Sequence, residues 1–403
     1  MEKLIKLRNL FCSGGGSKSV LYPVFAMGLE KRGILQEFTH ASGTSGGALF
    51  ASLLGFGCKP KHLLSMYGYS SKNIYNYPDM SLKTVIKQRN EDTFAPESMG
   101  SYAINTLLYG KLIGSPFTIQ KPVHTEHPLE EALYTVLTNK TFLKEMKPVY
   151  GKFNTSKIRK LTFGQWNKFL DELGEDKCKE FGLRHISVAV TMMLENEIVP
   201  QIFTSKKDSE FSEISMDVPI LKAVSASATF PGVLPAQIIN IGGQDIPCID
   251  GGLYLNLPFH SGLVDEGENS MVLSLDNKRV LDAIDYGKYI NCGHIDRMLI
   301  ETLFNTRSYV DKVYWDSVYG FQLLKGDILI GLNVNAAGKS AKAIETLTGE
   351  VSIEQLIEAE TYIKEYLNRI DECGILAQGG TYAEFAGINY LRYIEQKDES
   401  IIE

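Results

Sequence analysis

The sequence predicts an α/β protein, a three-layer α/β/α sandwich around a mainly parallel central sheet, with a mostly helical C-terminal region added to it. Two observations carry this prediction. The first 60 residues alternate strand and helix patterns twice, which is typical of a parallel sheet with helices on its faces. Beyond about residue 277 helical periodicity dominates, most clearly in the acidic amphipathic segment "SIEQLIEAETYIKEYLNRIDE" at residues 352–372.

The N-terminal elements follow from local signals. Residues 7–13 mix apolar and β-favouring side chains, as a short buried strand does. The helix after the glycine run should begin near Lys18 or Ser19, because Pro23 is tolerated only in a first turn. Next come a predicted strand at residues 37–43 and a predicted helix at residues 46–57.

The middle of the chain, residues 60–180, is predicted to be a helical insertion. Its mixture of aromatic, small and glycine residues at residues 93–117 suits either a mobile lid or ordinary helical packing. We expect residues 1–300 to form one domain, insertion included, and residues 301–403 to form the mostly helical C-terminal region. Strand patterns return after the insertion at residues 185–193, 197–205, 246–254, 270–276 and 326–334, with a helix at residues 220–233.

Charge and cysteine usage exclude several classes of protein. The chain has 48 acidic and 41 basic residues, and this net charge of -7 is not the basic footprint of a nucleic-acid binder. The six cysteines are scattered without CxxC spacing, so neither a zinc site nor a redox pair is expected. We expect free thiols in a reducing compartment, no metal and no cofactor.

The N-terminus interleaves charges with apolar residues and lacks the continuous apolar core of a signal peptide. No apolar run of 18 residues occurs, so no transmembrane helix is expected. The sequence predicts a cytoplasmic or peripheral membrane protein, or one that is secreted by a route needing no such signal.

The first chemical motif is "GTSGG" at residues 43–47, which fits G-x-S-x-G with Ser45 at its centre. This spacing places a serine on a sharp strand-to-helix turn, where small neighbours let the strand and the helix approach each other. The predicted strand and helix on either side supply that context. The alternative is a glycine-rich turn that only packs a helix on a sheet.

The second motif is the glycine run at residues 14–16. A P-loop ending at Lys18 and Ser19 would require glycine at Cys12 and Ser17, so a nucleotide phosphate loop is disfavoured. Consecutive backbone N–H groups at a helix N-terminus can instead bind the oxyanion of a reacting carbonyl. Both motifs follow predicted strands, at the edge of a parallel sheet where ligands bind.

The third motif is Asp250 followed by Gly251 and Gly252, and it offers a base for Ser45. A carboxylate at a strand end, followed by two glycines, can approach a serine hydroxyl directly. Aspartate is a weak base in water, with an ordinary pKa of about 3.9, so burial and contact with Ser45 would have to raise its proton affinity. The alternative is an ordinary Asp-Gly-Gly turn.

In this order the three motifs resemble the patatin-like phospholipase family, whose pattern is G-G-G-x-[KR]-G, then G-x-S-x-G, then D-G-[GA]. The segment "AVSASATFPGVLP" at residues 223–235 also resembles the family segment ahead of the aspartate. The resemblance covers about residues 5–60 and 180–280. It departs at Ser19, where the family has a glycine, and this puts the fine geometry of that turn in question.

The resemblance implies a lipid acyl hydrolase of the phospholipase A or lysophospholipase type, which acts on phospholipid or lysophospholipid at a membrane surface. Ser45 would attack the ester carbonyl, and Asp250 would accept its proton. The backbone N–H groups of Gly14, Gly15 and Gly16 would hold the oxyanion, so neither a histidine nor a metal ion is required.

Several alternatives stay open at this point. Lys18 either contacts an anionic head group of the substrate or is a solvated charge at a helix start. A Ser-His-Asp esterase would use His260 or His294, which follow Asp250 in the chain as in α/β-hydrolases. The chain could also bind lipid without catalysis, or be a latent enzyme that a protein activator switches on through the C-terminal region.

Overall fold

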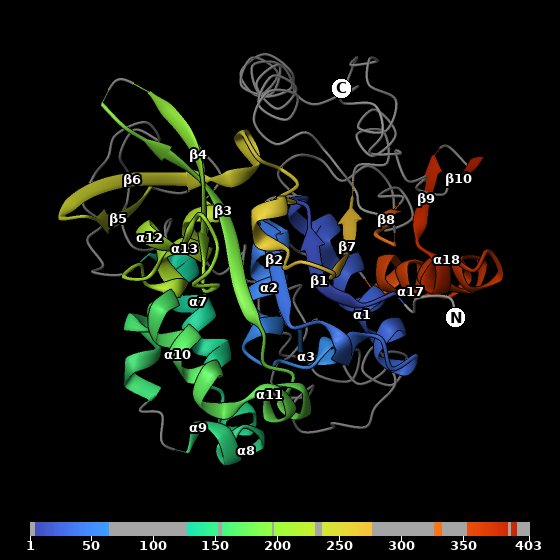
Figure 1. Ribbon diagram of the computed structural model, residues 1–403, viewed down its shortest axis with the longest axis horizontal. Helices are drawn as coiled ribbons and strands as arrows, with labels where there is room; N and C mark the ends of the chain where they lie inside the picture. The colour runs from blue at the N-terminus through green and yellow to red at the C-terminus, as the bar shows by residue number, and fades with distance from the viewer. Residues whose placement is uncertain are drawn as a thin grey trace.

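The computed structural model describes residues 5–63, 127–151, 155–195, 197–229, 236–275, 326–332, 353–385 and 388–392 (Figure 1). Within these residues ten strands form one sheet in the order β10-β9-β8-β7-β1-β2-β3-β6-β5, with β4 paired to β3. The strands are β1 (Leu7–Cys12), β2 (His40–Thr44), β3 (His185–Met193), β4 (Ile198–Thr204), β5 (Gln237–Ile241), β6 (Gln244–Asp250), β7 (Asn269–Ser274), β8 (Ile328–Gly331), β9 (Gly380–Phe385) and β10 (Ile388–Arg392).

The centre of this sheet is parallel. β1 lies between β2 and β7, and parallel pairing continues through β3 on one side and through β8 and β9 on the other. β4 and β6 run antiparallel to β3, β5 runs antiparallel to β6, and β10 runs antiparallel to β9. The predicted α/β fold with a mainly parallel sheet is therefore confirmed.

Side chains alternate between the two faces of the sheet, as the pleat of a strand requires. On β1, Leu10 and Cys12 point into the large core shared with the helices, whereas Phe11 points to the opposite face, toward Leu255 and Phe259. The described helices are α1 (Leu21–Lys31), α2 (Gly46–Gly55), α3 (Pro60–Leu63), α7 (Pro128–Leu137), α8 (Lys140–Glu145), α9 (Lys147–Tyr150), α10 (Phe163–Leu173), α11 (Glu175–Phe181), α12 (Ser212–Ser215), α13 (Ile220–Ser227), α17 (Ile353–Glu372) and α18 (Ile375–Gln378).

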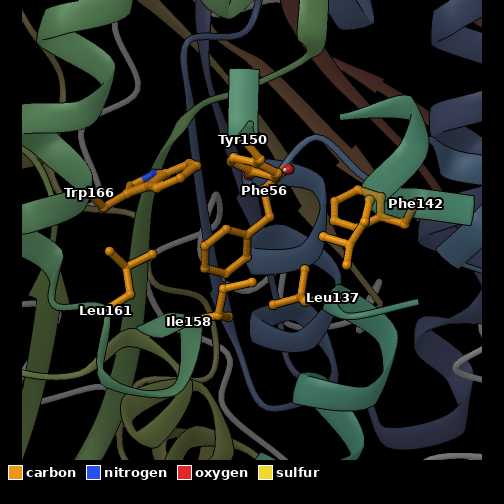
Figure 2. A pocket seen from close by; sticks show the side chains of 8 residues that line it. Phe56, Leu137, Phe142, Tyr150, Ile158, Leu161 and Trp166 are labelled. Atoms are coloured by element: carbon orange, nitrogen blue, oxygen red, sulfur yellow. Dashed lines mark hydrogen bonds between the residues drawn. The ribbon is translucent and has the colours of Figure 1, made fainter. Parts of the chain in front are cut away.

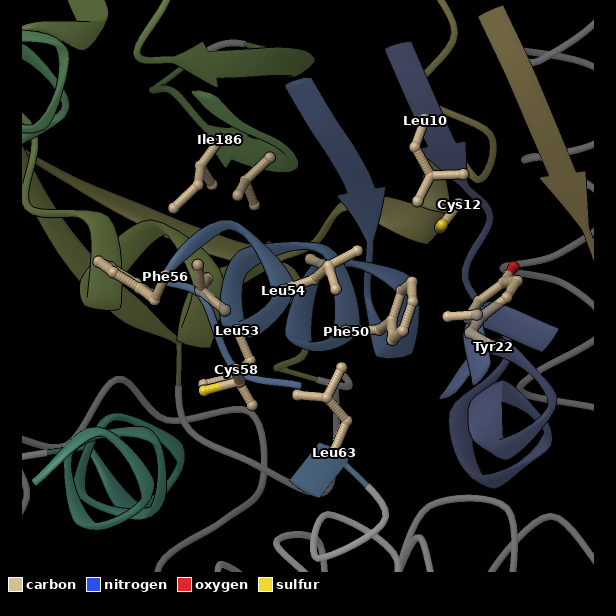
Figure 3. Packing of buried hydrophobic residues seen from close by; sticks show 14 of the residues in the cluster. Leu10, Cys12, Tyr22, Phe50, Leu53, Leu54, Phe56, Cys58, Leu63 and Ile186 are labelled. Carbon is tan, nitrogen blue, oxygen red and sulfur yellow. The ribbon is translucent and has the colours of Figure 1, made fainter. Parts of the chain in front are cut away.

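Helix α2 is the centre of the large core. Phe50, Leu53 and Leu54 project from it, and they pack among residues of β1, β3 and α1 that include Leu10 and Ile186 (Figure 3). A helix that is apolar on most of its surface is stable only when it is buried. Burial of α2 fixes the position of its N-terminal end, where the "GTSGG" motif lies.

The predicted elements of the middle region are confirmed where the structure describes them. Within the predicted helical insertion α7 and α10 form helices, and the strand patterns at residues 185–193 and 197–205 form β3 and β4. The candidate lid at residues 93–117 lies outside the described residues.

The described part of the C-terminal region contains the helices α17 and α18 together with the strands β8, β9 and β10. The long helix α17 forms as predicted and packs on α1, where Gly28 leaves room for Leu367 and Arg32 donates to Asp371 at 2.6 Å and 2.9 Å. The late strand β8 also forms, but β9 and β10 were not predicted. These three strands extend the same sheet beyond β7.

Candidate active site

The strands β2 and β6 bring the "GTSGG" and Asp-Gly-Gly motifs together along β3. β4 occupies one edge of β3 along most of its length, so β2 and β6 share the other edge. β2 runs parallel to β3 and ends with Thr44 opposite Ala189, whereas β6 runs antiparallel and ends with Asp250 opposite Val190. The carboxyl ends of the two strands therefore face each other, one residue apart in register.

Ser45 stands on a strained turn between β2 and α2. Its φ of 53° and ψ of −123° make it the one non-glycine residue with positive φ among the described residues. A side chain on either neighbouring glycine would clash, because a Cβ on Gly43 would lie 2.2 Å from the Gly47 oxygen and a Cβ on Gly47 would lie 2.5 Å from the Cys12 oxygen. Such strain persists only where the surrounding contacts enforce it.

The Ser45 hydroxyl donates a hydrogen bond to Asp250. The distance from Ser45 Oγ to Asp250 Oδ2 is 2.7 Å, and Asp250 is only 6% exposed. The other carboxylate oxygen, Oδ1, accepts the Gly252 N–H at 2.7 Å. The backbone of Asp250 is held on both sides, because its N–H donates to the Thr229 carbonyl and its carbonyl accepts the Thr191 hydroxyl. The nucleophile and base predicted from the sequence are thus in direct contact.

A further serine, Ser227 at the end of α13, clamps the turn. Ser45 N–H donates to Ser227 Oγ at 2.9 Å, and this hydroxyl donates to the Ala189 carbonyl at 2.6 Å. Gly251 lies over the same carbonyl, since a Cβ there would be 2.1 Å from the Ala189 oxygen. Reasoning from the sequence included Ser227 only within the segment at residues 223–235, and nothing in the pattern indicated this contact.

The glycine run lies beside Ser45, but its three N–H groups are not equivalent. Gly14 N–H donates to the Asn256 carbonyl at 2.9 Å, so it is already used inside the protein. The N–H groups of Gly15 and Gly16 donate to none of the described residues. The Gly15 carbonyl accepts the Lys18 N–H at 3.1 Å. The C=O and N–H of a trans peptide point in opposite directions, so the Gly16 N–H points away from the Lys18 N–H. Two of the three predicted donors are open.

Ser19, the departure from the family pattern, is buried at 1% exposed. Its hydroxyl donates to the Gly16 carbonyl at 2.5 Å. The same side chain fills the space next to Gly46, where a Cβ would lie 2.6 Å from Ser19 Oγ. Ser19 therefore connects the glycine run to the first turn of α2.

The remaining predicted residues lie apart from this contact. Lys18 is half-buried in the first helical turn after the glycines, and it forms no ion pair with any residue that the structure describes. His260 Nδ1 accepts the Gly262 N–H at 3.0 Å and lies 3.3 Å from Glu210 Oε1, and burial lowers the pKa of this histidine to about 4. His294 lies outside the described residues.

An apolar hollow lies at the opposite end of α2 from Ser45. Phe56 lines it together with side chains of α7, α8, α9 and α10, among them Tyr150 and Trp166 (Figure 2). The ten residues of α2 separate this hollow from Ser45 by about 15 Å at 1.5 Å per residue. It is a gap in the aromatic core rather than part of the site.

In the described part of the chain, no group of three or more His, Cys, Asp or Glu side chains could hold a metal ion. Cys12, Cys58, Cys178, Cys248 and Cys373 have free thiols. Among the helices that the structure describes, none is long and apolar enough to cross a membrane.

Several solved structures resemble this chain at low sequence identity. VipD from Legionella pneumophila is 16% identical with a TM-score of 0.38, and the match covers 89% of this chain and 67% of that one. ExoU from the type III secretion system of Pseudomonas aeruginosa, solved in a heterodimeric complex with SpcU, is 18% identical with a TM-score of 0.38, covering 91% and 52%. Human GIVD cytosolic phospholipase A2 is 11% identical with a TM-score of 0.35, covering 92% and 59%.

At these TM-scores the structural likeness carries no argument by itself, and this chain spans little more than half of the ExoU and human chains. No curated protein matches the sequence. The family model described as "Patatin-like phospholipase" matches residues 10–263, a segment that contains the glycine run, Ser45 and Asp250. This match covers more than half of the chain, which therefore belongs to the patatin-like phospholipase family.

Proposed function

We propose that this protein hydrolyses acyl ester bonds of phospholipids or lysophospholipids at a membrane surface, with Ser45 as nucleophile and Asp250 as base. The observation that carries the proposal is the 2.7 Å hydrogen bond from Ser45 Oγ to Asp250 Oδ2. Membership of the patatin-like phospholipase family supplies the substrate class. The two groups already have the contact that proton transfer requires of a nucleophile and its base.

In the first half of the reaction Ser45 Oγ forms a bond to the ester carbonyl carbon, and its proton passes to Asp250 Oδ2. The carbonyl π electrons move to the oxygen, and this oxyanion accepts hydrogen bonds from Gly15 and Gly16 N–H. The bond to the leaving alcohol then breaks, and Asp250 returns the proton to the alcohol oxygen. The chain is left with an acyl group on Ser45.

In the second half Asp250 accepts a proton from water, and the water oxygen attacks the acyl carbon. The same backbone donors hold the second oxyanion. Its collapse breaks the bond to Ser45 Oγ, and the proton on Asp250 returns to that oxygen as the fatty acid leaves. Backbone dipoles that are already oriented act where charge develops, and each such donor is typically worth about 3 kcal/mol.

The histidine alternative has less support. His260 Nδ1 is occupied by the Gly262 N–H, while Ser45 donates directly to Asp250. Burial lowers the pKa of His260 to about 4, so this ring is neutral at pH 7 and surrounded by protein contacts. A lipid-binding protein without catalysis would have no need of a strained serine in contact with a buried carboxylate.

The test measures fatty acid release from phosphatidylcholine vesicles and from a soluble chromogenic ester, with and without eukaryotic cell extract as a source of activator. We expect Ser45→Ala to abolish release and Asp250→Asn to lower kcat by about 10³-fold to 10⁴-fold, because an amide cannot accept the proton. Asp245→Asn is the matched control, since Asp245 lies on the same strand and its side chain accepts a hydrogen bond from exposed Asn240.

Hydrolysis that persists in Ser45→Ala would refute the proposed mechanism. Absence of release from wild type under both conditions, with lipid binding retained, would favour the non-catalytic reading.

A further inference from the structure

The segment after Asp250 lies against the turn at residues 43–47, which carries Ser45 and is called the nucleophile turn below. Thr44 Oγ1 donates to the Leu255 carbonyl at 2.8 Å, and the next carbonyl, that of Asn256, accepts Gly14 N–H at 2.9 Å. These two bonds tie the segment to β2 and to the glycine run. They place Asn256 at the junction of all three motifs.

The side chain of Asn256 is wedged between two glycines. Its Oδ1 lies 2.6 Å from where a Cβ on Gly14 would be, and 3.0 Å from where a Cβ on Gly252 would be. A Cβ on Gly14 would also lie 3.1 Å from Ser45 Cβ, and a Cβ on Gly252 would lie 2.8 Å from Asp250 Oδ1. The amide therefore neighbours the nucleophile and the base, and glycine at both positions gives it room.

This amide has unused donors. Asn256 is half-buried, and its side chain makes no hydrogen bond to any residue that the structure describes. Because Oδ1 faces the backbone of Gly14 and Gly252, the planar amide directs Nδ2 away from both glycines. A partly desolvated amide beside the reacting centre without a protein partner is suited to bind a substrate oxygen.

We propose that the side-chain amide of Asn256 is a catalytic donor to the oxyanion. It takes the place of the Gly14 N–H, which already donates to the main-chain carbonyl of Asn256. The inference rests on the proposed hydrolase function and deepens it. Gly15 and Gly16 supply backbone donors, and Asn256 Nδ2 supplies the third. One residue thus anchors the glycine run through its main chain and contributes to the hole through its side chain.

The experiment compares Asn256→Ala and Asn256→Asp with wild type, using a soluble chromogenic ester and a fluorophosphonate probe. With the probe, Ser45 Oγ bonds to phosphorus, fluoride leaves, and the serine proton passes to Asp250, so intact mass reports the rate. This probe needs no lipid surface. Both variants keep the main-chain carbonyl that accepts Gly14 N–H, and thermal melting checks their folding.

Loss of one oxyanion donor lowers kcat by about 10²-fold to 10³-fold, and we expect this loss in Asn256→Ala with KM changed by less than about threefold. Phosphonylation should slow by a similar factor. The matched control Asn240→Ala removes an amide that donates to exposed Asp245 at 2.8 Å, and it should retain wild-type rates.

Asn256→Asp adds a signature that a purely structural role would not produce. At neutral pH the new carboxylate repels the oxyanion, whereas its protonated form can donate an O–H group. The neighbouring Asp250 raises the pKa of this carboxyl, because like charges disfavour ionisation. The ratio of variant activity to wild-type activity should therefore rise as pH falls from 7 to 5.

A kcat for Asn256→Ala within threefold of wild type, or a flat activity ratio for Asn256→Asp across this pH range, would overturn the inference. If Ser45→Ala removes activity while the Asn256 variants keep theirs, only this inference fails. If Ser45→Ala remains active or is still phosphonylated at the wild-type rate, the proposed function fails and this inference fails with it.

Discussion

The nucleophile turn and the glycine run face each other, yet the protein holds them in opposite ways. At the turn, Ser45 N–H, Ser45 Oγ and the Asp250 main chain all have partners within the protein. In the glycine run, Gly15 and Gly16 N–H have none among the described residues. In the proposed reaction the serine is fixed before substrate arrives, whereas the two N–H groups stay open for the charge that develops.

We expect the largest effect from changing Ser227, which accepts the Ser45 N–H and so holds the turn in place. Ser227→Ala removes the acceptor of the partly buried Ser45 N–H and the donor to the buried Ala189 carbonyl. We expect about 1–3 kcal/mol lower stability, because buried polar groups without partners lose their hydration without compensation. A shift of Ser45 Oγ should also lower kcat, and misplacement by 1 Å can cost about 10²-fold.

Ser225→Ala is the matched control, since Ser225 lies two residues earlier on α13 and its hydroxyl donates within that helix, to the Lys222 carbonyl. Chemical denaturation and ester hydrolysis measure the two effects. Equal kcat values for the two variants would show that the turn holds its geometry without the clamp.

The sequence predicted β1, β2, α2 and the turn at Ser45 from signals close together in the chain. The pairing of Ser45 with Asp250, which are 205 residues apart, was implied by the resemblance to the patatin-like phospholipase family. Periodicity indicated β1, β2 and α2, and glycine spacing indicated the turn at Ser45. In the structure that turn requires glycine at Gly43 and Gly47, because a Cβ at either position would clash with backbone atoms. The contact of Ser227, like that of Ser45 with Asp250, depends on register between distant strands, since β2 and β6 meet at Ala189 and Val190 on β3. The proposed role of Asn256 depends on the segment that follows β6.

Two of the C-terminal strands, β9 and β10, were missed for a related reason. β9 and β10 are short, and β10 completes an antiparallel pair at the edge of the sheet. The pattern that identified α17 extends over 20 residues, so it is far stronger than that of a strand of five or six.

A variant of Ser19 tests whether the glycine run at residues 14–16 needs a hydrogen bond to keep its shape. Ser19→Ala removes the hydrogen bond to the Gly16 carbonyl, which we expect to cost about 1 kcal/mol of stability. If transition-state stabilisation by the glycine run falls by the same ~1 kcal/mol, kcat falls roughly fivefold. Ser52→Ala removes a comparable hydroxyl on α2, which donates to Leu49, and should leave kcat unchanged. A kcat for Ser19→Ala equal to that control would indicate that the run keeps its shape unaided.

His260 gives the smallest effect on the reaction, and its influence is on acid stability. Burial lowers its pKa in the folded protein to about 4, from about 6.5 when unfolded. The unfolded chain therefore binds a proton more readily, so this histidine lowers folding stability progressively as pH falls from 6.5 toward 4 and has no such effect above 6.5.

His260→Asn offers an amide oxygen to the Gly262 N–H and cannot titrate. We expect its kcat at pH 8 to stay within about twofold of wild type, because proton transfer from Ser45 needs only Asp250. Between pH 6.5 and 4.5 its unfolding free energy, from denaturant titrations, should fall less steeply than that of wild type. Loss of activity at pH 8 with intact folding would instead place His260 in the reaction, and the direct contact between Ser45 and Asp250 would then be insufficient for catalysis.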